Sequence, residues 1–178
     1  MHYMSRLMTQ MAQVASAIVF CTLWRLAPFR PPNIEPVLAT AMSFGKKYGA
    51  VTATVFAILA MVAYDAITSG VTQWTIVTAG AYALVAAGSG FFFKIVKGIP
   101  GYVAYAVIAT LVYDFLTGVA AGALLFGMGW KTGLVGQIPF TINHLIGNAI
   151  LAVALSPLVE YLIERQRKHA QERVIATL

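Results

Sequence analysis

Four polar side chains recur at helical spacing in the C-terminal third of the chain. Gln137, Thr141, His144 and Asn148 lie within the stretch QIPFTINHLIGN and follow one another at intervals of four, three and four residues. On a helix this spacing places them along one stripe, whereas Asn143 faces elsewhere. Polar groups are costly in an apolar environment unless they are satisfied. The stripe therefore predicts either the wall of a ligand cavity or hydrogen bonds to a neighbouring helix.

Two aspartates form a second candidate group, because each ends an apolar run within a similar short motif. YDAITSG begins at Tyr64 and YDFLTGV at Tyr113, and the two share Tyr, Asp and Thr at the same offsets. Each run follows a turn that contains Lys and Gly, which predicts two parallel helices with Asp65 and Asp114 at similar depth. An ionisable side chain near a membrane interior is a functional candidate. A carboxylate in the last turn of a helix can also simply reach water, and both interpretations stay open.

The composition indicates which type of secondary structure carries these side chains. The chain has 178 residues, of which 60% are hydrophobic and only 10% charged, and its mean hydropathy is +0.79. That balance is typical of membrane proteins rather than of soluble domains. The apolar runs are continuous and approach the roughly 20 residues that a spanning helix needs, whereas a β-barrel would show short alternating segments. We therefore expect one all-α integral membrane domain over residues 1–178, with helices near 8–27, 36–45, 51–68, 74–93, 102–118 and 138–162.

The segment at 36–45 is too short for a perpendicular crossing, so the sequence leaves five or six crossings open. With six crossings and a cytoplasmic N-terminus, only Arg25, Arg30 and Lys131 among the basic residues lie outside. With five crossings and an external N-terminus, only Arg6 and Lys131 do. Both distributions satisfy the excess of basic residues in cytoplasmic loops. In both, the C-terminal stretch RQRKH is cytoplasmic and the helix ends that carry the two aspartates face outside.

The net charge of +6 does not indicate a nucleic-acid partner. The basic residues come in pairs between apolar segments, which is the pattern that orients a chain in a membrane. The lone Cys21 lies within the first apolar run, so an internal disulfide is excluded.

The stretch VAAGALLFGMGWKTGLVGQ, residues 119–137, is too apolar and too rich in Gly for a solvated loop. We expect it to fold over the outer mouth of the bundle as a lid whose glycines allow movement. Trp130 within it, and Trp74 at the start of an earlier predicted helix, are typical anchors at the membrane interface. Both also carry the flat ring needed to stack on a ligand.

Two features near the N-terminal end concern helix ends and helix contacts. Asn33 and Glu35 directly precede an apolar helix, an arrangement typical of an N-terminal cap, so capping is the expected role of Glu35 and a ligand contact the second. Ala12 and Ser16 are small residues four positions apart. That spacing allows another helix to approach closely, within the fold or in a partner subunit.

These segments together resemble the substrate-binding S component of energy-coupling factor (ECF) transporters. The likeness covers roughly residues 30–160 and depends on the order of PNIEPVLATAM, YDAITSG followed by WTIVTAGAY, YDFLTG and QIPFTINHLIGN. It implies six transmembrane helices with both termini in the cytoplasm, in the plasma membrane of a prokaryote. It also implies a pocket open to the outside that takes a vitamin or similar micronutrient.

The resemblance suggests a role for each candidate residue. The expected substrate-binding residues are Asp65, Asp114 and His144 for polar or charged ligand groups, Gln137, Thr141 and Asn148 for hydrogen bonds, and Trp74 and Trp130 for stacking. The resemblance also implies a membrane coupling subunit and two cytoplasmic ATPases for transport. The chain has no Gly-rich phosphate loop of its own, so any ATP hydrolysis must be done by partners. Ala12 and Ser16 would dock onto the coupling subunit, where the family has an Ala-x-x-x-Ala pattern. Met1 and His2 match the start of nickel and cobalt members but the following YMSR does not, so no metal or cofactor is expected.

Two other functions are weighed against this one. An intramembrane aspartyl protease would use two carboxylates that share a proton, but the Gly-x-Gly-Asp element of that class is missing. A structural membrane scaffold would satisfy the polar stripe with other helices and leave no cavity. We expect no enzymatic activity. The separation of Asp65 and Asp114 distinguishes a protease from a binding module, because a shared proton requires contact.

Overall fold

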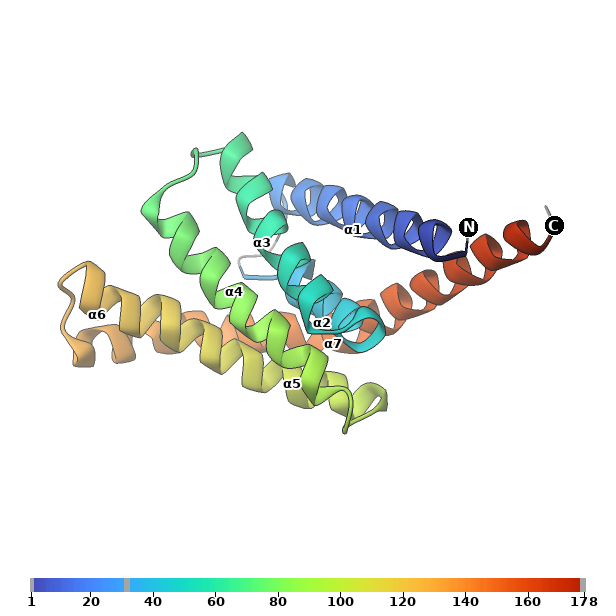
Figure 1. The fold of residues 1–178 in the computed structure, drawn as a ribbon. Helices are drawn as coiled ribbons and strands as arrows, with labels where there is room; N and C mark the ends of the chain where they lie inside the picture. Colours follow the sequence, from blue (N-terminus) through green and yellow to red (C-terminus); the bar gives the residue numbers. More distant parts are fainter. Residues whose placement is uncertain (1, 31–32, 177–178) are drawn as a thin grey trace.

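The computed structural model describes residues 2–30 and 33–176, and the regular structure in these ranges is helical (Figure 1). The elements are, in chain order, α1 His2–Leu26, α2 Pro36–Tyr48, α3 Ala50–Ile67, α4 Gln73–Phe92, α5 Gly98–Asp114, the π-helix η1 Phe115–Ala120, α6 Ala121–Leu125 and α7 Trp130–Ala176. Within the described ranges, five stretches are long and apolar enough to cross a membrane: Arg6–Leu26, Ala50–Ile67, Gln73–Phe92, Gly98–Leu125 and Trp130–Glu172. The prediction of an all-α fold of membrane type is confirmed.

The helices pass back and forth between two ends of the molecule. α1, α3 and α5 all start at the end where the N and C labels lie, and α2, α4 and α7 return toward it (Figure 1). The two helices that carry the repeated Tyr-Asp motif, α3 and α5, therefore run in the same general direction, as the repeat predicted. The turns at the opposite end lie between α1 and α2, between α3 and α4, and between α6 and α7.

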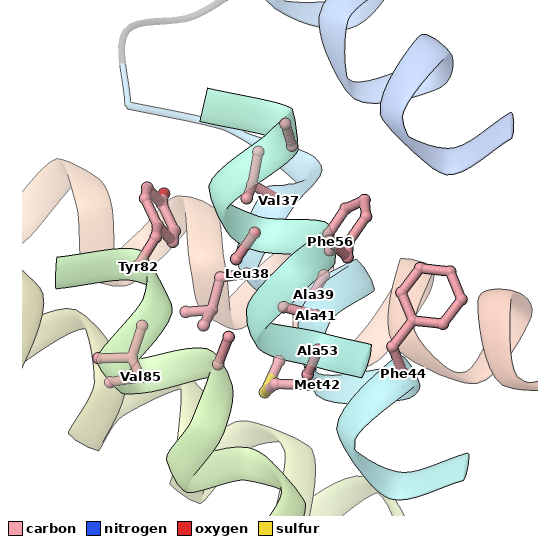
Figure 2. Packing of buried hydrophobic residues seen from close by; sticks show 14 of the residues in the cluster. Val37, Leu38, Ala39, Ala41, Met42, Phe44, Ala53, Phe56, Tyr82 and Val85 are labelled. Carbon is pink, nitrogen blue, oxygen red and sulfur yellow. The ribbon is translucent and has the colours of Figure 1, made fainter. Parts of the chain in front are cut away.

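The short helix α2 is enclosed by protein. All its residues from Pro36 to Gly45 are buried. Figure 2 shows its apolar side chains, among them Val37, Leu38 and Met42, in one cluster with side chains of α3 and α4. At 1.5 Å per residue, α2 spans about 20 Å, which is less than the roughly 30 Å of a bilayer core. An apolar helix of this length is stabilised by its neighbours, which shield it from lipid.

An ionic cluster joins α2, α5 and α7 near the end that holds the termini. Glu160 of α7 accepts hydrogen bonds from Lys46 Nζ at 2.7 Å and from the Tyr102 hydroxyl at 2.9 Å, and it forms an ion pair with Lys47 Nζ at 2.6 Å. Lys47 also pairs with Glu164. Partial burial opposes the charged form of Lys47, but the hydrogen bonds to the two glutamates outweigh it and raise the pKa of Lys47. The cluster ties three helices together where the apolar core ends.

The predicted lid over residues 119–137 is wrong. The fifth helix does not end near residue 118 but continues without interruption through η1 and α6 to Leu125, and the next helix starts at Trp130. Only residues 126–129 lie outside helices, in a turn where Gly127 has φ 67°. An apolar loop in a membrane would leave its backbone N–H and C=O groups unpaired, so an apolar, Gly-rich segment still forms helix there.

The last helix is also longer than predicted. It begins at Trp130 rather than near residue 138 and extends to Ala176, so Pro139 and Pro157 both lie inside it. A helix that began near residue 138 would hold Pro139 in its first turn, where its missing N–H costs nothing, but the observed helix places Pro139 beyond its second turn. Pro removes one backbone hydrogen bond inside a helix, and neighbouring helices compensate for this in membrane proteins.

The prediction that Glu35 caps α2 is wrong as well. Glu35 occupies the N-cap position with an extended backbone, but its side chain makes no cap hydrogen bond. Its carboxylate instead lies 3.6 Å from Arg25 Nε and 3.7 Å from Arg30 Nη1. Two guanidinium groups offer a partly buried carboxylate more stabilisation than the backbone N–H groups of one helix turn, so the tertiary contacts prevail.

Candidate functional site

Two side-chain contacts join α5 to α7 inside the bundle. His144 Nδ1 lies 2.7 Å from Asp114 Oδ1, and the Asn148 amide donates to Thr110 Oγ1 at 2.8 Å. All four side chains are buried. The spacing explains the pairing, because Thr110 and Asp114 are one turn apart on α5, as are His144 and Asn148 on α7. The inner half of the predicted polar stripe thus faces a matching pair of polar residues on the neighbouring helix.

Asp114 lies deep in the bundle rather than at the rim. Helix continues for 11 residues beyond it, through η1 and α6 to Leu125, which corresponds to about 16 Å of helix. The prediction that both aspartates occupy a last external turn is therefore wrong for Asp114, although Asp65 does lie in the last turn of α3. The π-helix η1 starts at the residue after Asp114. π-helical turns occur frequently at functional sites, where they change the direction in which side chains project.

The polar atoms at this depth are only partly satisfied. Asp114 Oδ2 and Asn148 Oδ1 are buried and have no hydrogen-bond partner among the described residues. An acceptor without a donor in a buried site costs about 1–3 kcal/mol, and more when it belongs to a charged group. Both unpaired atoms are acceptors, so the site favours a ligand that donates hydrogen bonds.

A groove of about 330 Å³ adjoins Asp114 between α5, η1 and the first part of α7. Gln137 and Thr141, the outer half of the polar stripe, line it together with Asp114. The remaining lining side chains are apolar: Leu111, Phe115, Val119, Leu134, Ile138 and Ile142. A mostly apolar concavity with a few convergent polar groups is typical of small-molecule sites. The stripe therefore has both of the roles that the sequence left open. Its inner half forms side-chain contacts with α5, and its outer half lines a cavity.

Aromatic rings hold the imidazole of His144 in place. The rings of Tyr113 and Phe140 meet it edge to face, at centroid distances of 5.6 Å and 5.5 Å. Tyr113 also packs against Tyr82 of α4 with a centroid distance of 4.4 Å. With its Nδ1 on Asp114 and rings on two sides, His144 has little freedom to rotate.

A second polar cluster, which the sequence did not predict, gathers around Arg25 at the end of α1. Its guanidinium lies 3.9 Å from the centre of the Tyr64 ring and 3.2 Å from the sulfur of Met61, in addition to the Glu35 contact. The sequence does contain one sign of this cluster, because Arg25 lies inside the first apolar run. An arginine is costly in a membrane unless it is paired.

The chain matches one family, described as a family of unknown function, DUF6580, over residues 5–172. It belongs to that family. No curated protein and no solved structure matches the chain.

The other predicted ligand residues of this DUF6580 protein lie apart from the groove. Asp65 is buried at the end of α3, where its backbone carbonyl accepts from the N–H groups of Thr68 and Gly70. Trp74, in the first turn of α4, is 45% exposed and packs on Phe126 with a centroid distance of 5.8 Å. Trp130 starts α7 and is 53% exposed. Both tryptophans lie near helix ends, as interface anchors do.

The predicted docking residues of the DUF6580 chain lie on the exposed side of α1. Ala12 and Ser16 are both exposed. Ser16 also lines a second groove of about 320 Å³ between α1, α2 and α7, which is mainly apolar and includes Gln13 and Phe20. This face is therefore free to meet another helix.

The geometry does not fit a proton shared by two aspartates. Asp114 Oδ1 contacts His144 and Asp114 Oδ2 has no hydrogen-bond partner, so among the described residues Asp65 does not bond to it. The protease alternative lacks the contact that it requires. No group of three or more His, Cys, Asp or Glu residues in the described part of the chain is arranged to hold a metal ion. Met1, which matches the first residue of the nickel and cobalt members of the ECF family, lies outside the described residues.

Proposed function

We propose that this DUF6580 protein is the substrate-binding membrane subunit of an ECF-type importer, which captures a vitamin or related micronutrient from outside the cell. The observation that supports it best is the Asp114–His144 pair beside a groove lined by Gln137 and Thr141, with an unpaired carboxylate oxygen on Asp114. Ionisable residues at membrane depth are costly and usually functional. A groove with such a group at its wall is suited to hold a small solute.

The path of the chain supports six crossings with both termini on one side. The start of α1 and the end of α7 lie at the same end of the molecule, so the chain needs an even number of passes (Figure 1). Five long helices give an odd number, and α2, which runs from the far end back toward the termini, makes the sixth pass. The side of the termini then carries Lys46, Lys47, Lys94, Lys97 and the basic end of α7, and this excess of basic residues supports a cytoplasmic position for that side in a prokaryotic cell.

Uptake requires energy from partners. The chain has no phosphate-binding loop, so two cytoplasmic ATPases would hydrolyse ATP, and a membrane coupling subunit would connect them to this chain. The exposed face of α1 with Ala12 and Ser16 supplies a surface for the coupling subunit. Small side chains allow another helix to approach closely.

A structural scaffold is the second candidate, and one observation favours it. The Asn148–Thr110 and His144–Asp114 contacts join α5 to α7 without any ligand. If the whole stripe served only to hold helices together, replacing groove residues that make no interhelical bond would have no functional effect. Thr141 lines the groove and makes no interhelical bond to any of the described residues.

The test is purification of the chain from native membranes in mild detergent, followed by mass spectrometry of bound small molecules and partner proteins. We expect a bound solute together with ATPase subunits. Thr141→Leu, which fills the groove, should lose the solute, and Glu172→Gln, which changes an exposed carboxylate on the C-terminal part of α7, should retain it. If neither a solute nor an ATPase subunit is recovered, the proposed importer function is wrong.

A further inference from the structure

The groove beside Asp114 opens on the outer surface of the helix bundle. Five of its apolar lining side chains are about half exposed: Leu111 and Phe115 at 49%, Ile142 at 52%, Ile138 at 54% and Leu134 at 58%. They lie on helices that are long and apolar enough to cross a membrane. Half-exposed aliphatic and aromatic side chains at that depth face lipid rather than water. The groove is thus accessible from the hydrocarbon layer.

The inner wall of the groove carries a different chemistry. Asp114 accepts or shares one hydrogen bond at Oδ1, and its Oδ2 has no donor in the described part of the chain. Charge-assisted hydrogen bonds to a carboxylate are among the strongest in proteins, so a donor placed there is strongly favoured. Gln137 and Thr141 add side chains that can hold further polar atoms of a ligand head.

We propose that this groove binds a lipophilic cation: a protonated amine or amidine on an apolar body, with its N–H groups toward Asp114 and its body along the apolar wall. This inference rests on the proposed function, because it assigns the class of solute that the site takes. The charges agree, since a cationic donor offsets the carboxylate and satisfies its free oxygen in one contact. An anionic head would instead lie against the Asp114 carboxylate in a groove whose lining contains no Lys, Arg or His.

The proposal has a direct test in a matched series of three probes. The full chain in lipid nanodiscs is heated with 4-butylbenzamidinium, 4-butylbenzamide or 4-butylbenzoate, which share one body and differ in the charge and donors of the head. We expect the amidinium to raise Tm and the amide to raise it less, whereas the benzoate should leave it unchanged. Unsubstituted benzamidinium should bind more weakly than the butyl compound, because burial of the tail in the groove raises the affinity about fourfold per CH₂.

Two pairs of variants place the effect at this groove. Asp114→Asn should weaken amidinium binding about tenfold or more, while Glu172→Gln, in an exposed His–Glu pair, should not change it. Should Asp114→Asn fail to fold, Leu134→Trp fills the groove without touching the Asp114–His144 contact. Leu84→Trp is its control, because Leu84 is equally exposed, at 57%, on α4 and away from the groove.

Each result bears on the ligand class separately from the importer function. A stabilising effect of benzoate that equals that of the amidinium would overturn the proposal, as would an amidinium effect that survives Leu134→Trp. A neutral or anionic solute recovered from native membranes and lost in Thr141→Leu would refute the cation while leaving the importer function intact. Amidinium binding without any ATPase partner would support the cation site and count against the importer.

Discussion

The side-chain amide of Gln137 occupies the space beside the backbone of Gly118. A Cβ atom added at Gly118 would lie 1.8 Å from Gln137 Oε1 and 2.3 Å from its Cδ. Gly118 belongs to η1, and Gln137 lines the groove on α7. The lack of a side chain at one position of the π-helix therefore determines where a polar group of the groove lies.

Gly118→Ala should change the groove more than it changes stability. The atom in the way is the far end of a flexible side chain, so Gln137 can move aside, and the helix gains from Ala instead of Gly. We expect the free energy of unfolding to change by less than about 1.5 kcal/mol, but binding of 4-butylbenzamidinium to fall several-fold. Thermal shift and SDS-induced unfolding measure the two effects. Gly136→Ala is the control, because nothing lies within 4 Å of its added Cβ; equal binding by both variants would contradict the role of Gln137.

Gly90→Ala should be much more damaging to the fold. Its added Cβ would lie 2.3 Å from the backbone N and 2.5 Å from the Cα of Ala50, and backbone atoms at a helix start cannot move aside as a side chain does. We expect a loss of about 1–3 kcal/mol or more, measured by SDS-induced unfolding of the purified chain.

Gly80→Ala on the same helix is the matched control. No atom lies within 4 Å of its added Cβ, so it should be neutral or stabilise by up to about 1 kcal/mol through helix propensity. Similar unfolding of the two variants would show that α4 does not pack as closely on the start of α3 as described.

The sequence predicted the general fold because its signals are local. Runs of apolar residues fix the presence of helices, and the run predicted at 51–68 corresponds to α3, where Ala53 and Ala57 are fully buried. The stripe of Gln137, Thr141 and His144 was found from periodicity alone. Polar groups at membrane depth must have a partner or a cavity, so that pattern carries information about the tertiary structure.

The sequence could not predict the depth of Asp114. Gly-rich, Met-containing segments resemble loops in soluble proteins, and only the need to pair backbone groups in a membrane extends the helix to Leu125. The partners of Glu35 and Asp114 are side chains on other helices. Their pairing depends on how α1, α2, α5 and α7 pack, and no short stretch of sequence encodes that geometry.

Glu160→Gln should destabilise the end of the bundle that holds the termini. The variant weakens ion pairs to Lys46 and Lys47 but keeps the size of the side chain and an acceptor for Tyr102. The Glu160 side chain is only 19% exposed, so the charges are incompletely screened by water. We expect a loss of about 1–3 kcal/mol in SDS-induced unfolding. Glu172→Gln, whose side chain is 72% exposed, should change stability by less than about 0.5 kcal/mol, and a similar effect of both would show that burial of Glu160 is unimportant.

Thr110→Val and Asn148→Leu test how far the stripe acts as a link between helices. Each variant removes one partner of a buried 2.8 Å hydrogen bond, so each should destabilise, and the double variant should lose less than the sum of the two. Hydrogen bonds between membrane helices average about 0.6 kcal/mol and reach about 1.7 kcal/mol in double-mutant cycles, so the coupling energy should fall in that range. Thr110→Val combined with Leu84→Ala, which lies exposed on α4, should be additive. A coupling near zero for Thr110 and Asn148 would mean that Asn148, like Asp114, has its polar group held in place for a ligand rather than for the fold.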